Sequence, residues 1–446
     1  MLGELKYLRK SCRIAKLFVL LHFRKIGEME IITENKISPI EVTFKNSMSM
    51  PFQRWYSYIE GYSVTFVQKL ISDFCDCPSL IYEPFAGTGS TLFAADSMGC
   101  DTIFSEVNPL LRFLISIKLT TMGMGHSERK MLADQLRDIS ESIISHSLAL
   151  SPSDELAKTY HNVFGSSQYF PEAELDLVLR LRTYIQQVRI YDGLLADLIM
   201  VAILACLLPI SYLKKQGDVR FRTEQERSNI PRTENILPQK LQEIASDLMA
   251  FEYFTCQSHQ LITPNAKNIG KVQSQKISDV ITSPPYLNGT NYFRNTKLEL
   301  WYLGCLKDKQ SLRAYRNEAL TSGINDVLLK ASETPYIYHS PLLETTLSEL
   351  KVQAYDSRIP QMARCYFNEM SELFGGLRKH LCADANLLID IGDSIFSGVH
   401  IKTDDILVEV LESLGYTFNE KILLRQRRSR CGGQLAQVLL SFKHRQ

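Results

Sequence analysis

Two parts of the chain alternate short apolar runs with longer amphipathic stretches. Residues 80–82 and 102–105 are apolar runs of strand length, and the pattern at residues 91–98 between them predicts a helix that ends at Gly99. The turn into this helix contains two glycines, so the order is strand, glycine turn, helix and strand, a β-α-β unit. Later segments repeat the alternation, with strands predicted at residues 279–282 and 386–390 and helices at residues 361–381 and 405–414.

The end of the chain has a different pattern. Residues 418–424 and 436–442 are strand-length runs joined by a polar turn that contains Gly432 and Gly433, which predicts an antiparallel pair. Strands that alternate with helices favour a parallel sheet covered on both faces. We therefore predict an α/β fold, a doubly wound, mostly parallel, Rossmann-like sheet with a C-terminal antiparallel hairpin and a large helical insertion.

A long helical segment interrupts the alternation. A β-α-β unit takes roughly 30 residues, yet 194 positions separate Gly89 from Ser283. Helical patterns fill much of this interval, at residues 128–145, 172–188, 194–208 and 239–249. Residues 194–209 are strongly apolar, but a run of about 15 residues is too short to span a bilayer and predicts a buried helix.

These patterns set the expected domain boundaries. Residues 46–120 and 260–446 form one sheet domain, residues 121–259 a mainly helical insertion, and residues 306–360 a second, smaller and more polar insertion. Residues 1–45 are an N-terminal extension. Its first 28 residues hold seven Lys and Arg and two acids around a short apolar core. That pattern fits an amphipathic surface helix, and it also fits translation that begins at Met29.

The composition is that of an ordinary globular protein, with 45% hydrophobic and 22% charged residues. The ten cysteines are dispersed, with no Cys-x-x-Cys pair and no Cys/His cluster at zinc spacing. This usage predicts reduced thiols, a cytoplasmic location and no metal site. The 50 Lys and Arg against 49 Asp and Glu give a net charge of +1, which by itself counts mildly against a nucleic-acid partner.

The glycine turn, residues 83–90, has the features of a nucleoside-cofactor site. Gly87 and Gly89 allow a tight turn and a close approach to a ligand, and the start of a helix favours a polar or anionic group. Glu106 ends the next strand, where a carboxylate can accept hydrogen bonds from both hydroxyls of a ribose. The turn matches neither the pyrophosphate-binding Gly-x-Gly-x-x-Gly pattern nor a P-loop. A cofactor with a ribose and no phosphate fits better, and S-adenosylmethionine is the common one.

A second site is predicted at Ser283, Pro284, Pro285 and Tyr286, which directly follow the strand at residues 279–282. Open α/β sheets bind ligands at the carboxyl ends of their strands. Two consecutive prolines fix an extended bend and supply no N–H, so the carbonyls of Ser283 and Pro284 can accept hydrogen bonds from an exocyclic amine. Tyr286 offers an aromatic face on which a planar base can stack.

Together these motifs resemble the S-adenosylmethionine-dependent amino-methyltransferases of DNA, whose N4-cytosine branch typically carries Ser-Pro-Pro-Tyr. The likeness covers about residues 50–120 and 260–446, which makes the sheet domain the expected catalytic domain, and it includes further motifs at residues 53–63, 366–370, 391–394 and 425–430. Glu83 and Asn265 both stand where relatives more often carry Asp. The cofactor-binding residues that the resemblance implies are Arg54, Tyr58, Glu83, Phe85, Ala86, Gly87, Thr88, Gly89, Ser90, Glu106, Asn108 and Asn265.

The resemblance implies direct, in-line methyl transfer to the N4 amine of a cytosine flipped out of duplex DNA. Ser283, Pro284, Pro285 and Tyr286 are then the catalytic residues, and the Pro-Cys nucleophile of a C5-cytosine enzyme is absent from the sequence. Two alternatives stay open at this point. One is the same fold acting on adenine N6 or on RNA, and the other is a non-catalytic nucleic-acid-binding subunit.

The charge is unevenly distributed along the chain. The first 28 residues carry +5 and the last 26 carry +7, so the remainder holds 36 basic against 47 acidic side chains. Local, salt-dependent binding to duplex DNA is therefore expected, within a restriction–modification system whose endonuclease acts on the same site. Target recognition is expected in residues 120–260 or, failing that, 306–360. The predicted DNA-binding residues are Lys214, Lys215, Arg220 and Arg222 in a loop of the large insertion and Arg425, Arg427, Arg428 and Arg430 in the terminal hairpin.

Overall fold

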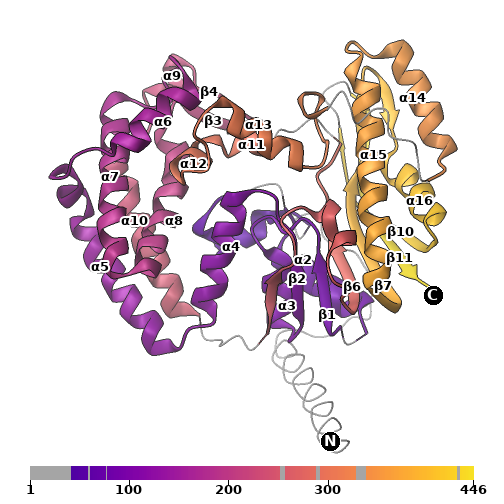
Figure 1. Ribbon diagram of the computed structural model, residues 1–446, viewed down its shortest axis with the longest axis horizontal. Helices are drawn as coiled ribbons and strands as arrows, with labels where there is room; N and C mark the ends of the chain where they lie inside the picture. The colour runs from indigo at the N-terminus through magenta and orange to yellow at the C-terminus, as the bar shows by residue number, and fades with distance from the viewer. Residues whose placement is uncertain are drawn as a thin grey trace, which may run out of the picture. The chain divides into compact units, whose positions relative to one another are not determined.

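The computed structural model describes residues 42–58, 61–76, 78–251, 257–287, 292–327, 338–428 and 432–445. The expected N-terminal extension as far as residue 41 lies outside the described residues, and so does Arg430. The described part contains a central sheet with its covering helices and a separate group of longer helices (Figure 1).

The central sheet has the strand order β10-β11-β7-β6-β1-β2-β5. β11 runs antiparallel to both of its neighbours, whereas the other paired strands are parallel. The predicted fold class, a mostly parallel α/β sheet with a C-terminal antiparallel hairpin, is therefore confirmed (Figure 1). The strands are β1 (Leu80–Glu83), β2 (Asp101–Phe104), β5 (His259–Leu261), β6 (Ile277–Thr282), β7 (Leu381–Gly392), β10 (Tyr416–Arg428) and β11 (Gln434–His444).

The sheet has a topological switch point between β1 and β6. After β1 the chain adds β2 and β5 on one side, and then adds β6 and β7 on the other. Ligands of open α/β sheets bind outside the carboxyl ends of the strands at such a point. Glu83 ends β1 and Thr282 ends β6, and the two strands are directly paired. The glycine turn and the segment Ser283–Tyr286 therefore start side by side, although they are about 200 residues apart in the sequence.

The edge strand β5 was missed by the sequence patterns. It has only three residues, His259 to Leu261, and the last two of them are exposed. An edge strand of this kind carries no continuous apolar run, because only one of its sides pairs with a neighbour and its faces are partly solvated. The run at residues 279–282 is thus the fourth parallel strand along the chain and not the third.

Helices cover the sheet and form two groups by their contacts. The helices α2 (Val64–Phe74) and α3 (Ser90–Ser97) pack together near β2, and α4 (Pro109–Met122) follows β2. On the other half of the sheet, α14 (Pro341–Gln353), α15 (Arg358–Leu377) and α16 (Thr403–Ser413) pack beside β7 and β10 (Figure 1). Short elements complete this part: η1 (Phe44–Ser49), η2 (Gln53–Trp55), η3 (Ala266–Lys271), η6 (Arg378–His380), β8 (Ser394–Phe396) and β9 (Val399–Ile401).

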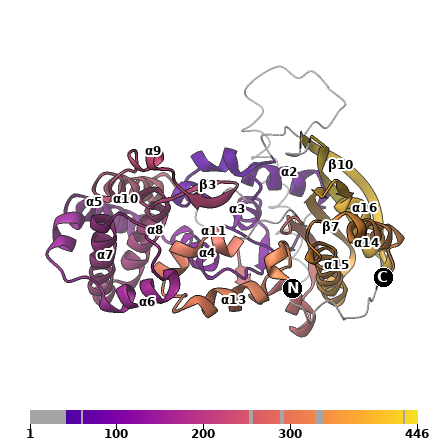
Figure 2. The same cartoon turned by 90° about the horizontal axis from the view of Figure 1, so that it is seen from above.

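A helical bundle lies between β2 and β5 in the chain. Its long members α5 (His126–Leu148), α7 (Glu172–Tyr191), α8 (Gly193–Ile210) and α10 (Thr233–Ala250) contact one another (Figure 2). The segment expected to be a basic loop is a hairpin of β3 (Leu213–Gln216) and β4 (Asp218–Phe221). The remaining elements are α6 (Asp154–Phe164), α9 (Glu224–Arg227), α11 (Tyr292–Asn295), α12 (Lys297–Tyr302), α13 (Lys309–Glu318) and η4 (Ile324–Asp326).

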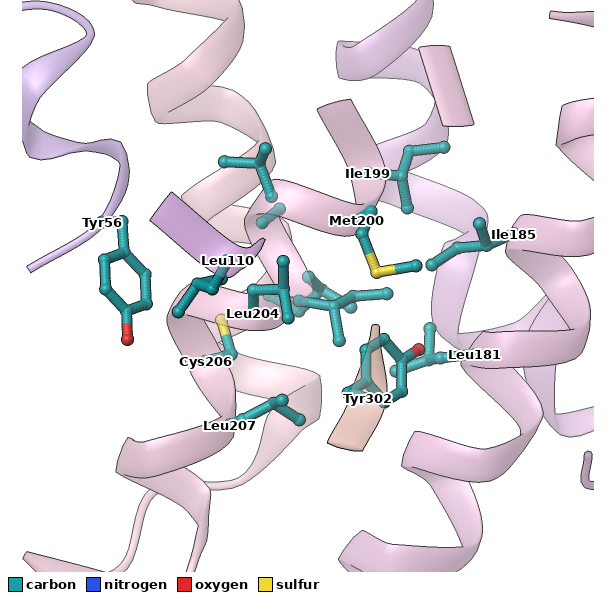
Figure 3. Packing of buried hydrophobic residues seen from close by; sticks show 14 of the residues in the cluster. Tyr56, Leu110, Leu181, Ile185, Ile199, Met200, Leu204, Cys206, Leu207 and Tyr302 are labelled. Atoms are coloured by element: carbon teal, nitrogen blue, oxygen red, sulfur yellow. The ribbon is translucent and has the colours of Figure 1, made fainter. Parts of the chain in front are cut away.

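The apolar helix α8 forms the centre of the bundle. It is long and apolar enough to cross a membrane by composition, but 67% of its residues are buried in this structure. Met200 and Leu204 of α8 lie among side chains of α7, α4 and α12, including Ile185, Leu110 and Tyr302 (Figure 3). The prediction of a buried core helix is confirmed. Because α4 also contacts it and Leu111 of α4 lines the cleft described below, the bundle is joined to one wall of that cleft.

Candidate active site

A cleft of about 260 Å³ opens at the carboxyl ends of β1, β2 and β6. It is lined by the glycine turn, by all four residues of Ser283–Tyr286, and by the segments 264–267 and 316–326. Arg425 and Arg427 of β10, Gln437 of β11 and Asp390 of β7 line it on the β7 side of the sheet, which is called the far end below. The two motifs singled out in the sequence therefore share one cavity.

The glycine turn has a backbone that only glycine adopts without strain. Gly87 and Gly89 have φ values of +56° and +91°, and Gly89 N donates to the Ala86 carbonyl at 2.8 Å. A side chain on Gly87 would point at the Tyr58 ring, 3.5 Å from its Cε1. Tyr58, Phe85 and Gly87 line the cleft, whereas Ala86, Thr88, Gly89 and Ser90 form the body of the turn without lining it.

Glu106 is buried in one wall of the cleft. Its Oε2 accepts a hydrogen bond from Gly87 N at 2.8 Å, and its Oε1 accepts one from Asn108 N at 2.7 Å. Burial raises the pKa of this carboxyl to about 7, although the two N–H groups act in the opposite direction. A carboxylate has about four acceptor positions, so two positions remain, the number that the two hydroxyls of a ribose require.

Glu83 has a different environment. Its Oε1 accepts hydrogen bonds from Phe85 N at 3.0 Å and from the Thr282 hydroxyl at 2.6 Å. Its Oε2 accepts from the hydroxyls of Thr91, at 2.7 Å, and Tyr62. Burial raises the pKa of Glu83, and these donors oppose the shift. Four protein donors fill the positions of the carboxylate, so Glu83 ties β1 to β6 and α3, and its contact with a cofactor stays a prediction.

Arg54 forms an ion pair with the buried Asp247 of α10. The same carboxylate accepts hydrogen bonds from Phe52 N at 3.0 Å and from Trp55 Nε1 at 2.9 Å. This arrangement fastens the segment before the glycine turn to the helical bundle, and Arg54 does not line the cleft. Tyr58, four residues later, does line it, so the segment contributes a ring rather than a guanidinium to the cavity.

Asn108 and Asn265 both hold backbone turns at the cleft. Asn108 Oδ1 accepts from Leu110 N and begins α4, while its Nδ2 donates to the Thr296 hydroxyl at 3.0 Å. Asn265 Oδ1 accepts from Lys267 N at 3.1 Å, and its Nδ2 donates to Glu318 Oε2 at 2.8 Å. Glu318 belongs to the 316–326 wall, which sequence patterns had treated only as part of a polar insertion.

The 316–326 wall is fixed by an ion pair within it and by a hydrogen bond to Glu369. Arg316 pairs with Asp326 at 3.0 Å, within the wall. Lys267 pairs with Glu369 of α15 at 3.4 Å, and Glu369 also accepts a hydrogen bond from Thr321 N. Glu369 lies in one of the later sequence motifs, residues 366–370, so this motif anchors the wall of the cleft.

Tyr286 lies against β7 at the far end of the cleft. Its hydroxyl donates to Asp390 Oδ1 at 2.9 Å, and Gln437 Nε2 donates to both oxygens of Asp390, at 2.7 and 2.9 Å. Burial raises the pKa of Asp390 to about 6, although Gln437 and Tyr286 act in the opposite direction. The ring crosses Gly392 so closely that a Cβ there would lie 3.1 Å from two ring carbons. The tyrosine is therefore fixed in place at its hydroxyl and along one edge.

Comparisons with known proteins show which proteins the chain resembles. No protein-family model matches the chain. The type II methyltransferase M.BsoBI of Geobacillus stearothermophilus is 22% identical over 445 aligned positions, which cover 88% of this chain and 84% of that protein. The type II methyltransferases M.AvaI of a Nostoc strain and of Anabaena variabilis are each 26% identical over 423 positions, 86% of this chain and 82% of theirs.

The chain is thus similar to type II methyltransferases over most of its length. The aligned share is too large for the sheet half alone, so the likeness to these methyltransferases extends into the helical bundle. The expectation drawn from the glycine turn and Ser-Pro-Pro-Tyr is supported at this coarser level.

The basic residues predicted to bind DNA differ in their surroundings. On the β3–β4 hairpin, Arg220 donates two hydrogen bonds to Glu226, and Lys214 pairs with the same carboxylate at 3.0 Å. Arg222 donates to the carbonyl oxygens of residues 209, 211 and 213, so it holds the base of the hairpin. Lys215 lies over the Tyr58 ring, with its Nζ 5.7 Å from the centroid. The basic hairpin therefore contacts the segment that precedes the glycine turn.

On β10 the predicted residues are more open to a ligand. Arg425 and Arg427 line the cleft, and Arg428 is exposed beyond it. Lys421 of the same strand is instead paired with Asp404 and Asp405 of α16.

Three residues of the site were not predicted. Asp390 and Gln437 hold Tyr286, and Lys118 of α4 is buried below the glycine turn, where its Nζ donates to the Thr88 carbonyl at 3.1 Å. Burial lowers the pKa of Lys118 to about 7. A charged residue in an otherwise apolar helical stretch was the available signal for Lys118, whereas nothing local distinguishes Asp390 or Gln437.

Proposed function

We propose that this protein is a site-specific DNA methyltransferase that transfers a methyl group from S-adenosylmethionine to the N4 amine of a cytosine flipped out of duplex DNA. The setting we propose is a bacterial restriction–modification system in the cytoplasm, with an endonuclease that cuts the same sequence. The similarity to type II methyltransferases supports the reaction class and this setting.

One observation carries the proposal. The glycine turn with Glu106 and the Ser283–Tyr286 segment, which suit a ribose-containing cofactor and a planar base with an exocyclic amine, line the same cleft. A methyl transfer needs a donor site and an acceptor site that open to each other. The switch point between β1 and β6 brings the two segments together, so a donor site and an acceptor site can open to each other in this cleft.

The residues present suit S-adenosylmethionine on chemical grounds. Glu106 keeps two acceptor positions for ribose hydroxyls, and Gly87 leaves room beneath the Tyr58 ring. Asn265 also lines the cleft, and beyond its bonds to Glu318 and Lys267 N it keeps one amide hydrogen for a purine edge. When bound, S-adenosylmethionine supplies an electrophilic methyl group on a positively charged sulfur.

The residues of the second motif suit the acceptor amine. Because Pro284 and Pro285 have no N–H, the carbonyl oxygens beside them are not matched by local donors. The Ser283 hydroxyl and the Ser283 or Pro284 carbonyl can accept the two amine hydrogens, which turns the nitrogen lone pair toward the donor site. Tyr286 provides the face for stacking, with its ring orientation fixed by Asp390. Positioning then carries most of the catalysis, and no strong base is needed, since the proton can leave after the amine is methylated.

The test is transfer of a labelled methyl group from S-adenosylmethionine to duplex DNA, followed by mass spectrometry of the nucleosides. We expect N4-methylcytosine. N6-methyladenine as the product would overturn the cytosine assignment, and labelling of RNA alone would overturn DNA as the substrate.

The variant that tests the base pocket is Tyr286→Ala. We expect loss of methyl transfer with cofactor affinity largely retained, because Tyr286 is held by Asp390 of β7, whereas Gly87 and Glu106 follow β1 and β2 on the other side of the switch point. Full activity of this variant would refute the assigned base pocket. Tight cofactor binding with no transfer to any nucleic acid would favour a non-catalytic subunit.

A further inference from the structure

One row of residues runs across three strands at the far end of the cleft. Arg425 of β10 is paired with Gln437 of β11, and Gln437 is paired with Gly392 of β7. Directly paired residues of neighbouring strands project from the same face of a sheet. A Cβ on Gly392 would point at the Tyr286 ring, so Gln437 and Arg425 project on the side where Tyr286 lies.

An irregularity in β10 places Arg425 on this face. The register shifts between Leu423 and Arg425, because Leu423 is paired with Val438 and Arg425 with the adjacent Gln437. Leu424 is therefore an extra residue without a partner in the ladder, and its side chain is buried. A bulge of this kind re-aims the side chains that follow it. Without it, Leu424 would occupy the place that Arg425 has beside the cleft.

The row carries unused hydrogen-bonding atoms. Arg425 Nε and Gln437 Oε1 are both buried, and among the described residues neither has a hydrogen-bond partner. Both residues line the cleft, and Gln437 is held by its Nε2 on Asp390. Buried polar atoms in native proteins are nearly always paired, so a donor and an acceptor left without partners inside a cavity indicate a ligand that supplies them.

The proposed function names the ligand at this end of the cleft as a flipped base. A cytosine whose N4 amine lies at Ser283 and whose ring lies on Tyr286 carries two acceptors beyond the amine, N3 and then O2. Adenine shares the amine and the adjacent ring nitrogen, but it has a C–H where cytosine has the C2 carbonyl. A donor that meets the O2 position therefore distinguishes the two bases, which the amine contacts alone do not.

We propose that Arg425 reads the O2 edge of the target base and so selects cytosine over adenine, an inference that rests on the proposed methyltransferase function. Arg425 is at one end of the row, and Gly392, against which the Tyr286 ring packs, is at the other. The guanidinium therefore lies on the face of the sheet where a base stacked on that ring would present its edge. With adenine in the pocket, Arg425 Nε would stay buried without a hydrogen-bond partner. This unpaired donor makes the adenine complex less stable than the cytosine complex.

Arg427 supplies the natural comparison. It lies two residues further along β10, so it projects from the same face, and its side chain is exposed. An exposed guanidinium that lines the cleft suits a DNA phosphate, a contact that every sequence offers equally. The two arginines of one strand thus have separable roles, base edge for Arg425 and backbone for Arg427.

The experiment uses the full-length enzyme and duplex oligonucleotides that contain its site, located by sequencing DNA methylated by the wild type. The target cytosine is replaced in one oligonucleotide by a 2-aminopyridine C-nucleoside, which keeps the amine and the ring nitrogen but has C–H in place of the C2 carbonyl. Methyl-transfer efficiency, kcat/KM, is measured on both oligonucleotides for the wild type, for Arg425→Met and for Arg427→Met.

We expect the wild type to prefer cytosine over the analogue by roughly 10- to 100-fold, the discrimination that a lost base contact commonly produces. Arg425→Met should reduce that ratio to near one by slowing transfer to cytosine. Arg427→Met should keep the ratio and lower the efficiency on both oligonucleotides equally. An unchanged ratio in Arg425→Met would overturn the inference and assign Arg425 to the phosphate backbone.

Two controls separate loss of the base contact from misfolding and from failure of the proposed function. Thermal unfolding of the Arg425→Met variant should match the wild type, because the substitution removes no hydrogen bond of the Nε atom. Failure of the wild type to methylate cytosine at all would refute the proposed function itself, which is a result distinct from an unchanged ratio.

Discussion

The close contact between Gly392 and Tyr286 gives a sharp prediction for Gly392→Ala. The added Cβ would lie 3.1 Å from Cδ2 and Cε2 of the ring and 3.7 Å from the Ala436 carbonyl oxygen. Carbon atoms in ordinary contact are about 3.5–4.0 Å apart. The ring must therefore move by roughly half an ångström, while its hydroxyl is still held by Asp390 at 2.9 Å.

The size of the effect follows from this displacement. A misplacement of about 1 Å at a reacting group can cost on the order of 100-fold in rate. Half that distance should cost about tenfold in kcat, or ~1.4 kcal/mol of activation free energy. The affinity for S-adenosylmethionine should stay unchanged, because Gly87 and Glu106 are placed by β1 and β2 and not by β7. The loss is therefore specific to the acceptor side.

The assay combines initial rates of labelled-methyl transfer at saturating cofactor with calorimetric measurement of cofactor binding. Gly375→Ala is the matched control, because a Cβ there would lie 3.8 Å from Leu414 Cδ2, an ordinary contact. This control should keep wild-type rates. Wild-type rates in Gly392→Ala, or a loss of cofactor affinity as large as the loss of rate, would refute the inference that the missing Cβ of Gly392 allows the Tyr286 ring its position.

Three other predictions follow from buried groups and close contacts. Gly376→Ala should destabilise the fold by about 2 kcal/mol or more in urea unfolding, because its Cβ would meet the backbone of Gly270 at 3.0 Å; a stability equal to that of Gly375→Ala would contradict this. Lys118→Met should remove a pH dependence of the free energy of unfolding. The pKa of Lys118 is lowered to about 7 in the folded state and is near 10.4 in the unfolded chain, so the folded state binds fewer protons between these pH values. Wild-type stability should then rise with pH from about 7 to 10, by up to about 1.4 kcal/mol per pH unit relative to the variant, and parallel stability curves would refute the burial of a titrating amine. Cofactor affinity should fall by about tenfold per pH unit below pH 7, because ribose hydroxyls need the ionised carboxylate of Glu106 and its pKa is raised to about 7; this slope should be absent in Glu106→Gln.

Much of the fold was predictable because its signals are local. The glycine turn between two apolar runs predicted the first β-α-β unit, and the two terminal runs predicted the antiparallel pair that β10 and β11 form. Glycine and proline constrain the backbone of their own few residues, so the turn at Gly87 and the bend at Pro284 can be recognised from the sequence. The short edge strand β5 could not, since its polar residues carry no such signal.

The sequence by itself determined which segments can carry chemistry, the glycine turn, Glu106 and Ser283–Tyr286. The tertiary structure alone decided how the side chains are used. Arg54 meets Asp247, which is 193 positions away, and Glu83 meets Thr282, which is 199 positions away. Such partners depend on strand order and register, which no local pattern encodes. For the same reason the shift that turns Arg425 toward Tyr286 became visible only in the paired strands, because a single extra residue in β10 sets which face its side chains reach.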